Sequence, residues 1–414
     1  MSYHNVHATH VTGLNVSYEH ISGDSFKIIL GMPVLCSGTF FNNGNCVWPE
    51  GLPQYTTFNV YCSDQGLSQS FTANLESSFD VSPLCASDSS LNSCENGPCA
   101  LLGIKYWNYT SIIDFSLIDT NSCTEWIIYW INGARRPAVN YTSNVNGLAY
   151  AKIRLQDFPT NHSVLFNSQR PVPFFCDGQP VQYNLSAFDP DNDSLSWSID
   201  TAWSDFGAGT LTSIPYASGY SAIQPMPGNT TVDPNSGVVS FTASIPSGFN
   251  HANYVVAVMV SEYDRISGEL KGNVHRDMMF YVIDSCNNLA PSDGGGISSF
   301  VTNCSILDSN TIEACAGQDF AFDILYYDYD TNGNLSSDSI FIECDIEQWI
   351  SGASWTHSGT NPDTLHVSVI NAVTLPDFTS FNVFVEDDFC PHPGFNSYVY
   401  RIVKSERTFL QADT

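Results

Sequence analysis

The stretch CDGQPVQYNLSAFDPDNDSLS at 176–196 occurs a second time, in diverged form, as CAGQDFAFDILYYDYDTNGNLS at 315–336. Cys, Gly and Gln match at one offset, and so do the first two aspartates of the acidic run. Self-similarity at a fixed offset indicates a repeated structural unit. Short alternating apolar runs surround both copies, as in YVVAVMV at 254–260 and YVYRIV at 398–403, with Gly, Pro, Asn and Asp clusters between them. This pattern predicts an all-β protein of tandem Ig-like β-sandwich domains, two of them internal repeats.

The repeat sets the predicted domain boundaries. At 414 residues the chain is too long for one ordinary core and suits two or three domains. The first part contains no copy of the repeat but is equally rich in strand-like runs, which indicates a distinct β-sandwich domain. We expect an N-terminal β-sandwich domain at 1–170, an Ig-like domain at 171–287, a flexible Gly-rich linker at 288–296, a second Ig-like copy at 297–404 and a C-terminal tail at 405–414.

Composition and charge restrict the partners. Charged residues make up only 13% of the chain, whereas Ser, Thr, Asn, Gly and aromatic residues are abundant, as is typical of extracellular β-proteins. The 42 acidic against 13 basic residues give a net charge of −29. Such a surface repels nucleic acid and anionic lipid, so neither is an expected partner, and it attracts divalent cations. No apolar run is long enough for a membrane-spanning helix, and MSYHNVHATH at 1–10 does not resemble a signal peptide.

The thirteen cysteines nevertheless indicate an oxidising compartment, and we expect a secreted, cell-surface protein. Two pairs are close enough in sequence for local bridges, one across a Glu-Asn-Gly-Pro turn and one across a predicted hairpin. The candidate disulfides are Cys94–Cys99, Cys304–Cys315 and Cys344–Cys390. Other pairings stay open, because spacing alone does not determine disulfide connectivity.

Several motifs carry a family resemblance. They are HATHVTGLNVSYEH at 7–20, DSFKIILGMPVLC at 24–36, VHRDMMFYVIDSC at 274–286 and VEDDFCPHPGFNSYVYRIV at 385–403, together with the repeat itself. In this order they resemble the secreted adhesin-like surface proteins of Bacteroidetes, of the gliding-motility-associated type, with Ig-like or PKD-like (cadherin-like) domains. The resemblance implies a cell-surface protein that is not an enzyme, and it does not fix a ligand.

The alternating acids Asp189, Asp191 and Asp193 lie directly before an alternating apolar run. Alternate carboxylates in an extended loop can direct several oxygens at one hard cation, and calcium takes about six to eight of them. Glu262 and Asp264, at the end of a predicted neighbouring strand, can complete the shell of a structural calcium ion. The corresponding residues of the second copy are Asp328, Asp330, Asn332, Glu386, Asp387 and Asp388. The alternative is a metal-free turn, in which the acids bond to backbone N–H groups.

No motif indicates catalysis. The sequence contains no GxSxG elbow, P-loop, HExxH or Gly-rich dinucleotide turn. Paired carboxylates act as acid and base where a cleft separates their pKa values, whereas a turn at the edge of a sandwich is solvated. We therefore expect a protein that is not an enzyme and has no catalytic residue. Glycoside hydrolysis stays open as an alternative, because it needs only two carboxylates placed by the fold.

Two kinds of glycosylation motif occur. The N-glycosylation candidates among the Asn-x-Ser/Thr sequons are Asn108, Asn140, Asn161, Asn184 and Asn229. Asp-Ser/Thr-apolar triplets resemble the O-glycosylation motif of Bacteroidetes, and they put candidate glycans on Ser194, Ser339 and Thr364.

These observations together predict an extracellular structural protein, in its most concrete form a subunit of a cell-surface filament. Both terminal segments alternate polar and apolar residues. An extended segment can add to a neighbour's sheet, and a head-to-tail contact that does not close produces a fibre of identical copies. The candidate inserted side chains are Val11, Leu14 and Val16 at one end and Phe409 and Leu410 at the other. The alternative function is a monomeric adhesin or glycan-binding module that binds surface glycans through exposed aromatic rings and calcium.

Overall fold

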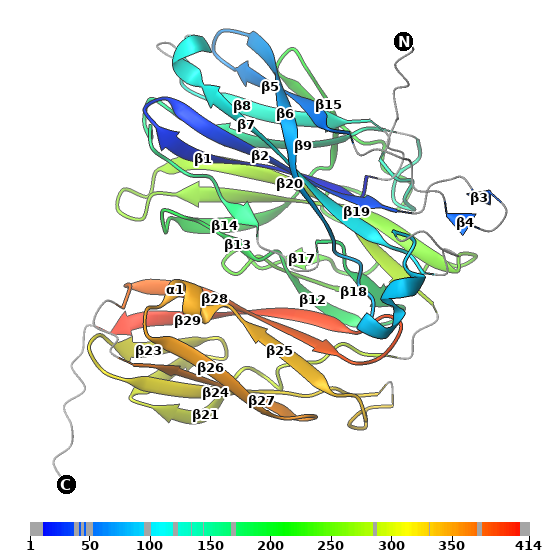
Figure 1. Ribbon diagram of the computed structural model, residues 1–414, viewed down its shortest axis with the longest axis vertical. Coiled ribbons are helices and arrows are strands. Elements are labelled where there is room, and N and C mark those ends of the chain that lie inside the picture. Colours follow the sequence, from blue (N-terminus) through cyan, green and yellow to red (C-terminus); the bar gives the residue numbers. More distant parts are fainter. Residues whose placement is uncertain are drawn as a thin grey trace. The chain divides into compact units, whose positions relative to one another are not determined.

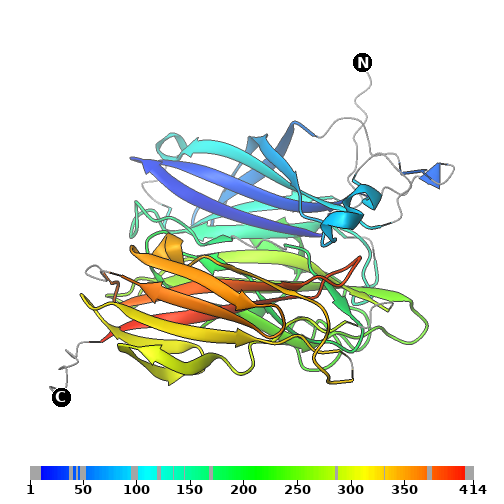
Figure 2. The same ribbon diagram turned by 60° about the horizontal axis from the view of Figure 1, so that its bottom comes forward.

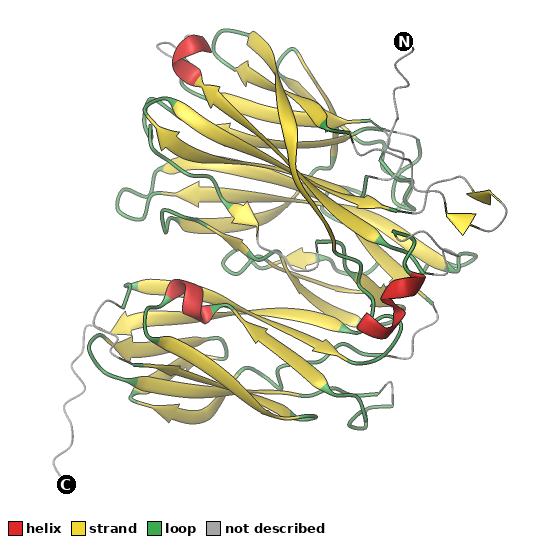
Figure 3. Cartoon of the chain, viewed as in Figure 1, coloured by secondary structure: helices red, strands yellow, loops and turns green. Residues whose placement is uncertain are grey.

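The computed structural model describes residues 11–36, 41–42, 45–46, 53–94, 101–118, 123–133, 135–143, 145–166, 171–284, 288–330, 332–370 and 375–405. Strands dominate this part of the chain (Figure 3), and its helices are α1 (Ile346–Trp349) and the 3-10 turns η1 (Ala86–Leu91) and η2 (Phe115–Ile118). The predicted all-β class is therefore confirmed. The chain divides into two compact units: unit 1 consists of Met1–Asp177 and Leu185–Asp284, and unit 2 of Gly178–Asn184 and Ser285–Thr414.

Unit 1 is built on one sheet of eleven strands (Figure 1). Ten of them follow one another in the order β1-β2-β7-β6-β5-β8-β9-β20-β19-β14, and β11 pairs with β20. Their bounds are β1 (Gly13–Ser22), β2 (Ser25–Leu35), β5 (Tyr55–Cys62), β6 (Leu67–Asp80), β7 (Ile104–Asp114), β8 (Trp126–Asn132), β9 (Gly147–Ile153), β11 (Phe174–Cys176), β14 (Ser194–Asp200), β19 (His251–Tyr263) and β20 (Leu270–Ile283).

The strand β1 closes part of this sheet on itself. It pairs along its length with β2 and also with β20, where Gly13 lies opposite Met278 and Leu14 opposite Asp277. Glycine permits the close approach, because a Cβ at Gly13 would lie only 2.8 Å from the carbonyl oxygen of Asp277.

Shorter strand pairs complete unit 1. They are β3 (Phe41–Asn42) with β4 (Asn45–Cys46), β10 (Leu165–Phe166) with β13 (Ala187–Phe188), β15 (Trp203–Gly207) with β16 (Thr210–Ser213), and β17 (Thr231–Val232) with β18 (Val238–Thr242).

The predicted boundary at residues 170 and 171 is wrong. β9, from the first predicted domain, pairs with β20, from the second, with Ile153 opposite Gly272 and Tyr150 opposite His275. The two segments therefore share one sheet and belong to one compact unit. Sequence repeats mark similar segments, but they do not show whether a preceding segment folds against them.

Unit 2 is a sandwich of two sheets (Figure 2). One has the order β21-β24-β27-β26 and the other β22-β23-β29-β28-β25. Their bounds are β21 (Ile297–Thr302), β22 (Cys304–Asp308), β23 (Thr311–Cys315), β24 (Phe320–Tyr326), β25 (Ile340–Cys344), β26 (Ala353–Gly359), β27 (Asp363–Val369), β28 (Phe378–Asp387) and β29 (Phe395–Ser405). The sheets meet through buried rings, as where the centroids of Phe322 and Phe381 lie 6.1 Å apart.

The repeat is visible in the strand order of the two units. The order β11-β20-β19-β14 in unit 1 matches β23-β29-β28-β25 in unit 2. In each case the first pair is parallel, with Cys176 opposite Ile283 and Cys315 opposite Ser405, and the others are antiparallel. A further strand, β12 (Pro180–Asn184), belongs by its contacts to unit 2, where the side-chain amide of Asn184 donates to Asn382 Oδ1 at 2.7 Å.

The segment 288–296 is not the flexible linker that its glycines suggested. Ser292 and Tyr327 exchange two backbone hydrogen bonds of 2.8 Å. Asn288 is buried, and its Nδ2 donates to Asp387 Oδ2 at 2.8 Å. These contacts fix the segment within unit 2.

The N-terminal candidates for strand exchange are also placed differently from the prediction. Val11, Leu14 and Val16 are at most 1% exposed, because β1 completes the sheet of its own unit. Side chains that fill their own core are not available to a neighbour in this state. The other candidates, Phe409 and Leu410, lie outside the described residues.

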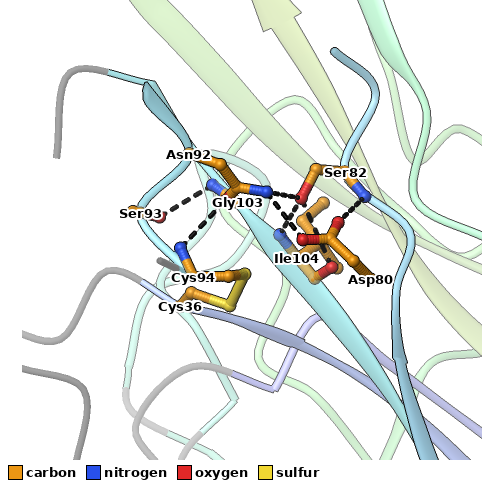
Figure 4. Close-up of a disulfide and its surroundings, with 8 residues drawn as sticks. All are labelled: Cys36, Asp80, Ser82, Asn92, Ser93, Cys94, Gly103 and Ile104. Atoms are coloured by element: carbon orange, nitrogen blue, oxygen red, sulfur yellow. Dashed lines mark hydrogen bonds between the residues drawn. A yellow bond between two sulfur atoms is a disulfide. The ribbon is translucent and has the colours of Figure 1, made fainter. Parts of the chain in front are cut away.

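The disulfides of unit 1 include Cys36–Cys94 and Cys62–Cys123, and Cys85 and Cys176 are disulfide-bonded as well. The first lies beside a polar network (Figure 4), in which Asn92 donates to Asp80 Oδ2 at 2.7 Å and accepts from the N–H of Cys94 at 2.8 Å. The predicted local bridge between Cys94 and Cys99 is therefore wrong.

The two disulfides predicted for the last domain are also wrong. Cys304 and Cys344 are thiols, while Cys390 is bonded to another cysteine. Burial raises the pKa of both thiols, that of Cys304 to about 11 and that of Cys344 to about 12. Neither thiol therefore forms a bridge with the partner that its spacing suggested. None of the described helices has the length and apolar character to cross a membrane.

Candidate cation site

The loop before β14 folds as a turn around Asp189. Its Oδ1 accepts hydrogen bonds from the N–H groups of Asp191 at 2.8 Å and Asp193 at 3.0 Å. Asn192 adopts a positive φ of 60°, which asparagine tolerates better than most residues. The turn interpretation is therefore correct for one oxygen of Asp189.

The same turn brings three carboxylates together. One oxygen from each of Asp189, Asp191 and Asp193 lies within 4.8 Å of the others. Asp189 is only 6% exposed, and its second oxygen, Oδ2, is buried without a hydrogen-bond partner. A buried carboxylate oxygen without a partner is costly, so the turn alone does not account for this group.

Glu262 of β19 adds a fourth acid. It lies opposite Leu195 in the neighbouring strand and is only 1% exposed. Its Oε1 accepts a hydrogen bond of 2.5 Å from Asn161 Nδ2, and Asn161 also has a buried oxygen, Oδ1, without a hydrogen-bond partner. The arrangement thus collects carboxylate and amide oxygens, the ligand type that calcium prefers.

Burial perturbs these acids strongly. It raises the pKa of Glu262 to about 9, and the charge of Asp189 adds to the effect. It raises the pKa of Asp189 to about 6, against the lowering effect of its hydrogen bond from Asp193. Such carboxyl groups need either a proton or a cation nearby.

Lys271 balances part of the negative charge, and His162 lies beside Asp191. Lys271 Nζ forms an ion pair with Asp193 Oδ2, in which both side chains are mostly buried. His162 donates its backbone N–H to Asp191 Oδ2 at 2.8 Å, and its ring Nδ1 lies 3.0 Å from Asp191 Oδ1. No sequence pattern connects Asn161, His162 or Lys271 with the acidic loop, because these residues are distant from it in the chain.

Asp264 does not belong to the group. It is half-buried and forms a turn of its own, accepting hydrogen bonds from the N–H groups of Ile266 at 3.1 Å and Ser267 at 2.7 Å. The hydrogen bonds with Ser267 hold the pKa of Asp264 below its usual value. The prediction that it completes the shell is therefore wrong.

The second copy retains a buried acid pair rather than a triad. Asp328 is fully buried, and neither of its carboxylate oxygens has a well-aligned hydrogen-bond partner. Burial raises its pKa to about 7, with Ser336 acting in the opposite direction. Asp387 is 1% exposed, and burial raises its pKa to about 8. Asp330, by contrast, forms an exposed turn with the N–H groups of Asn332 and Asn334.

Three of the predicted N-glycosylation sites are wrong. Asn140, Asn161 and Asn184 are at most 3% exposed, and the side-chain amide of each donates to other protein groups. A glycan cannot be attached to such a nitrogen without unfolding its surroundings. The remaining candidates are more accessible: Asn229 and Ser194 are exposed, and Asn108, Ser339 and Thr364 are half-buried.

No protein-family model matches the chain, and no curated protein does. Among solved structures it is similar to the N-terminal eight Ig domains of Down syndrome cell adhesion molecule, with 9% identity, 95% of this chain and 42% of that chain covered, and a TM-score of 0.18. It thus spans about two fifths of that protein.

Two further similarities are equally distant. Mouse protocadherin-24 EC1–3 shows 11% identity, coverage of 73% of this chain and 84% of that chain, and a TM-score of 0.21. The D00–D0 domain of intimin shows 12% identity, coverage of 57% and 98%, and a TM-score of 0.19. Similarities of this size carry no argument about what the protein does.

Proposed function

We propose that the protein is an extracellular structural protein whose copies assemble into a surface filament. The disulfides Cys36–Cys94 and Cys62–Cys123 support an oxidising compartment. Each closes a long loop, of 58 and 61 residues in sequence separation, around the large sheet of unit 1. Such bridges constrain the unfolded chain and suit a protein that must keep its shape outside the cell.

The observation that carries the assembly mode is the open edge at β22. Within the described residues, this strand pairs on one side with β23 and has no strand on its other side. It exposes Ile306 and Leu307, and Phe300 in the preceding β21 is 67% exposed. An unpaired edge presents a row of backbone N–H and C=O groups that an added strand can satisfy.

The occupant we propose is residues 406–414 of a second copy, ERTFLQADT, which follow β29 in the sequence. Nine extended residues span about 30 Å, which is longer than the five-residue β22. Phe409 and Leu410 would pack beside the exposed Ile306 and Leu307. Because the segment of one copy would add to the β22 edge of the next copy, the contact is head-to-tail and generates an open polymer.

Sedimentation velocity of the whole chain tests this assembly. We expect concentration-dependent polymers that are lost on deletion of 406–414 and on Leu307→Lys in β22. Ile112→Lys is the matched control, because Ile112 is an exposed apolar residue on a strand of unit 1, at 68% exposure against 55% for Leu307. Polymers of unchanged size after the deletion would contradict the proposed contact.

We also propose that a structural calcium ion binds at Asp189, Asp191 and Asp193. Support comes from the buried, unpartnered Asp189 Oδ2 and from the grouping of Asp189, Asp191 and Asp193, of which Asp193 is paired with Lys271. An ion there would join the loop before β14 to β19 through Glu262. The ion would stiffen the loop, and the calcium dependence of stability tests this directly.

A further inference from the structure

Three polar side chains on the outer face of unit 2 form a continuous hydrogen-bonded chain. His366 of β27 donates from Nδ1 to Asp323 Oδ1 of β24 at 2.8 Å. With its proton on Nδ1, the ring presents an unprotonated Nε2, which accepts the hydroxyl proton of Ser358 in β26 at 2.7 Å. The order of groups is hydroxyl, imidazole and carboxylate.

The sheet register produces this arrangement. β24, β27 and β26 are neighbours in one sheet, and Asp323 lies directly opposite His366. Thr356 lies opposite His366 on the other side, so Ser358, two residues along, is its diagonal neighbour on the same face. Inward-facing residues of the same strands, such as Phe322 and Leu365, fill the core and hold the strands in place.

The exposure of the three side chains decreases from Ser358 through His366 to Asp323. Ser358 is exposed, the side chain of His366 is 41% exposed, and that of Asp323 only 17%. The hydroxyl is therefore open to a ligand from solvent, while the carboxylate is shielded. β26 is also an edge strand, so no further strand covers Ser358 within the described residues.

We infer that Ser358 is an activated nucleophile that accepts acyl groups from small activated esters. The hydroxyl oxygen attacks the acyl carbon while its proton passes to His366 Nε2, and Asp323 stabilises the resulting imidazolium. The C–O bond to the leaving group breaks, and the leaving oxygen takes the proton from His366. Water then attacks the acyl-serine by the same route and releases a carboxylic acid, so that ester and water become acid and alcohol. This reactivity is independent of the proposed filament, because β22 lies in the other sheet.

Mass-spectrometric mapping after treatment with p-nitrophenyl acetate or a small fluorophosphonate tests the inference on the whole chain. Ser354 is the matched control: it is exposed on the same strand, but its hydroxyl contacts Ser368 Oγ at 3.0 Å rather than an imidazole. We expect Ser358 to react at least about tenfold faster than Ser354. His366→Gln and Asp323→Asn should each slow the labelling of Ser358 and leave that of Ser354 unchanged.

The pH profile of labelling adds a readout that a purely structural role would not produce. The profile of Ser358 should change in His366→Gln, whereas that of Ser354 should stay the same. Thermal unfolding of each variant shows whether the sheet is intact. Equal labelling of Ser358 and Ser354 in the intact protein, or labelling of Ser358 unaffected by His366→Gln, would overturn the inference.

Discussion

Glu262 at the end of β19 and Asp189 in the loop before β14 are two buried acids, and the charge of Asp189 acts on Glu262. Glu262 is 1% exposed and Asp189 is 6% exposed, although both are carboxylates. The charge of Asp189 adds to burial in raising the pKa of Glu262 to about 9. Two buried acids at one site need either a bound cation or a proton. The predictions for calcium and for pH depend on which of the two is bound.

Calcium should stabilise the protein through the Asp189 loop. At a calcium concentration about 100 times the dissociation constant, a single site adds about 2.7 kcal/mol to the free energy of unfolding. Asp189→Asn should remove most of this increment, measured by urea unfolding with calcium and with EDTA. Asp264→Asn is the control, since this carboxylate belongs to its own turn and should leave the increment unchanged. An increment that survives Asp189→Asn would place the ion elsewhere.

Without calcium, stability should fall as the pH rises through neutrality. The pKa of Glu262 is about 9 in the folded protein and about 4.5 as its ordinary value. The folded state therefore binds the proton of Glu262 more tightly than the unfolded state does. The contribution of Glu262 to the free energy of unfolding is complete below about pH 4.5 and is lost as the pH approaches 9. Asp189 acts in the same direction up to about pH 6.

Glu262→Gln tests this dependence, because an amide cannot ionise. Its unfolding midpoint in EDTA should vary less between pH 5 and 9 than that of the parent protein. Glu269→Gln, at an exposed acid of the same hairpin, provides the comparison. If both variants keep the parental slope, Glu262 does not carry the effect.

The buried ion pair of Arg135 and Asp277 should be costly to break. Arg135 Nη2 lies 2.6 Å from Asp277 Oδ2, and the side chains are 2% and 4% exposed. The geometry is that of an ion pair rather than of an aligned hydrogen bond, since Asp277 Oδ2 has no hydrogen-bond partner. Asp277→Asn leaves a buried cation uncompensated and should lower the free energy of unfolding by about 3–5 kcal/mol.

The exposed pair of Lys404 and Asp377 is the comparison for that measurement. Its atoms lie 2.8 Å apart, but the side chains are 38% and 90% exposed. Asp377→Asn should therefore change stability little. If Asp277→Asn and Asp377→Asn changed the free energy of unfolding equally, the Arg135 side chain would be solvated rather than buried.

Thiol mapping should distinguish the free cysteines from the bridged ones. Alkylation of the denatured, unreduced protein should modify Cys304 and Cys344 and leave Cys36, Cys62, Cys94 and Cys123 unmodified. Replacing Cys62 and Cys123 together by alanine should cost about 4 kcal/mol, as expected for a loop of 61 residues. Modification of Cys62 before reduction would contradict the bridge.

The sequence was sufficient to predict the all-β class and the loop that brings Asp189, Asp191 and Asp193 together. Alternating apolar residues and turn residues can be recognised in short stretches of sequence, and both copies of the repeat contain them. The closure of β1 onto β20 could not be predicted in this way. It depends on a pairing between Leu14 and Asp277, which are far apart in the chain, and local patterns contain no information about it.

The wrong glycosylation predictions and the residues that were missed also depend on contacts between distant segments of the chain. A sequon such as that of Asn140 contains no information about burial, and this side chain is fully buried between Pro225 O and Val255 O. Asn161 and Lys271 reach the acidic loop from distant segments. Ser358, His366 and Asp323 belong to three different strands, so no motif search could find their alignment.

Electron microscopy of the native surface material, with and without EDTA, tests the structural role most directly. We expect regular fibres that contain this chain along their length, shown by antibody labelling, with a repeat of about one chain length. Fibres that loosen in EDTA would also connect the acidic loop to their rigidity. Isolated particles at every concentration, labelled by the same antibody, would contradict the filament.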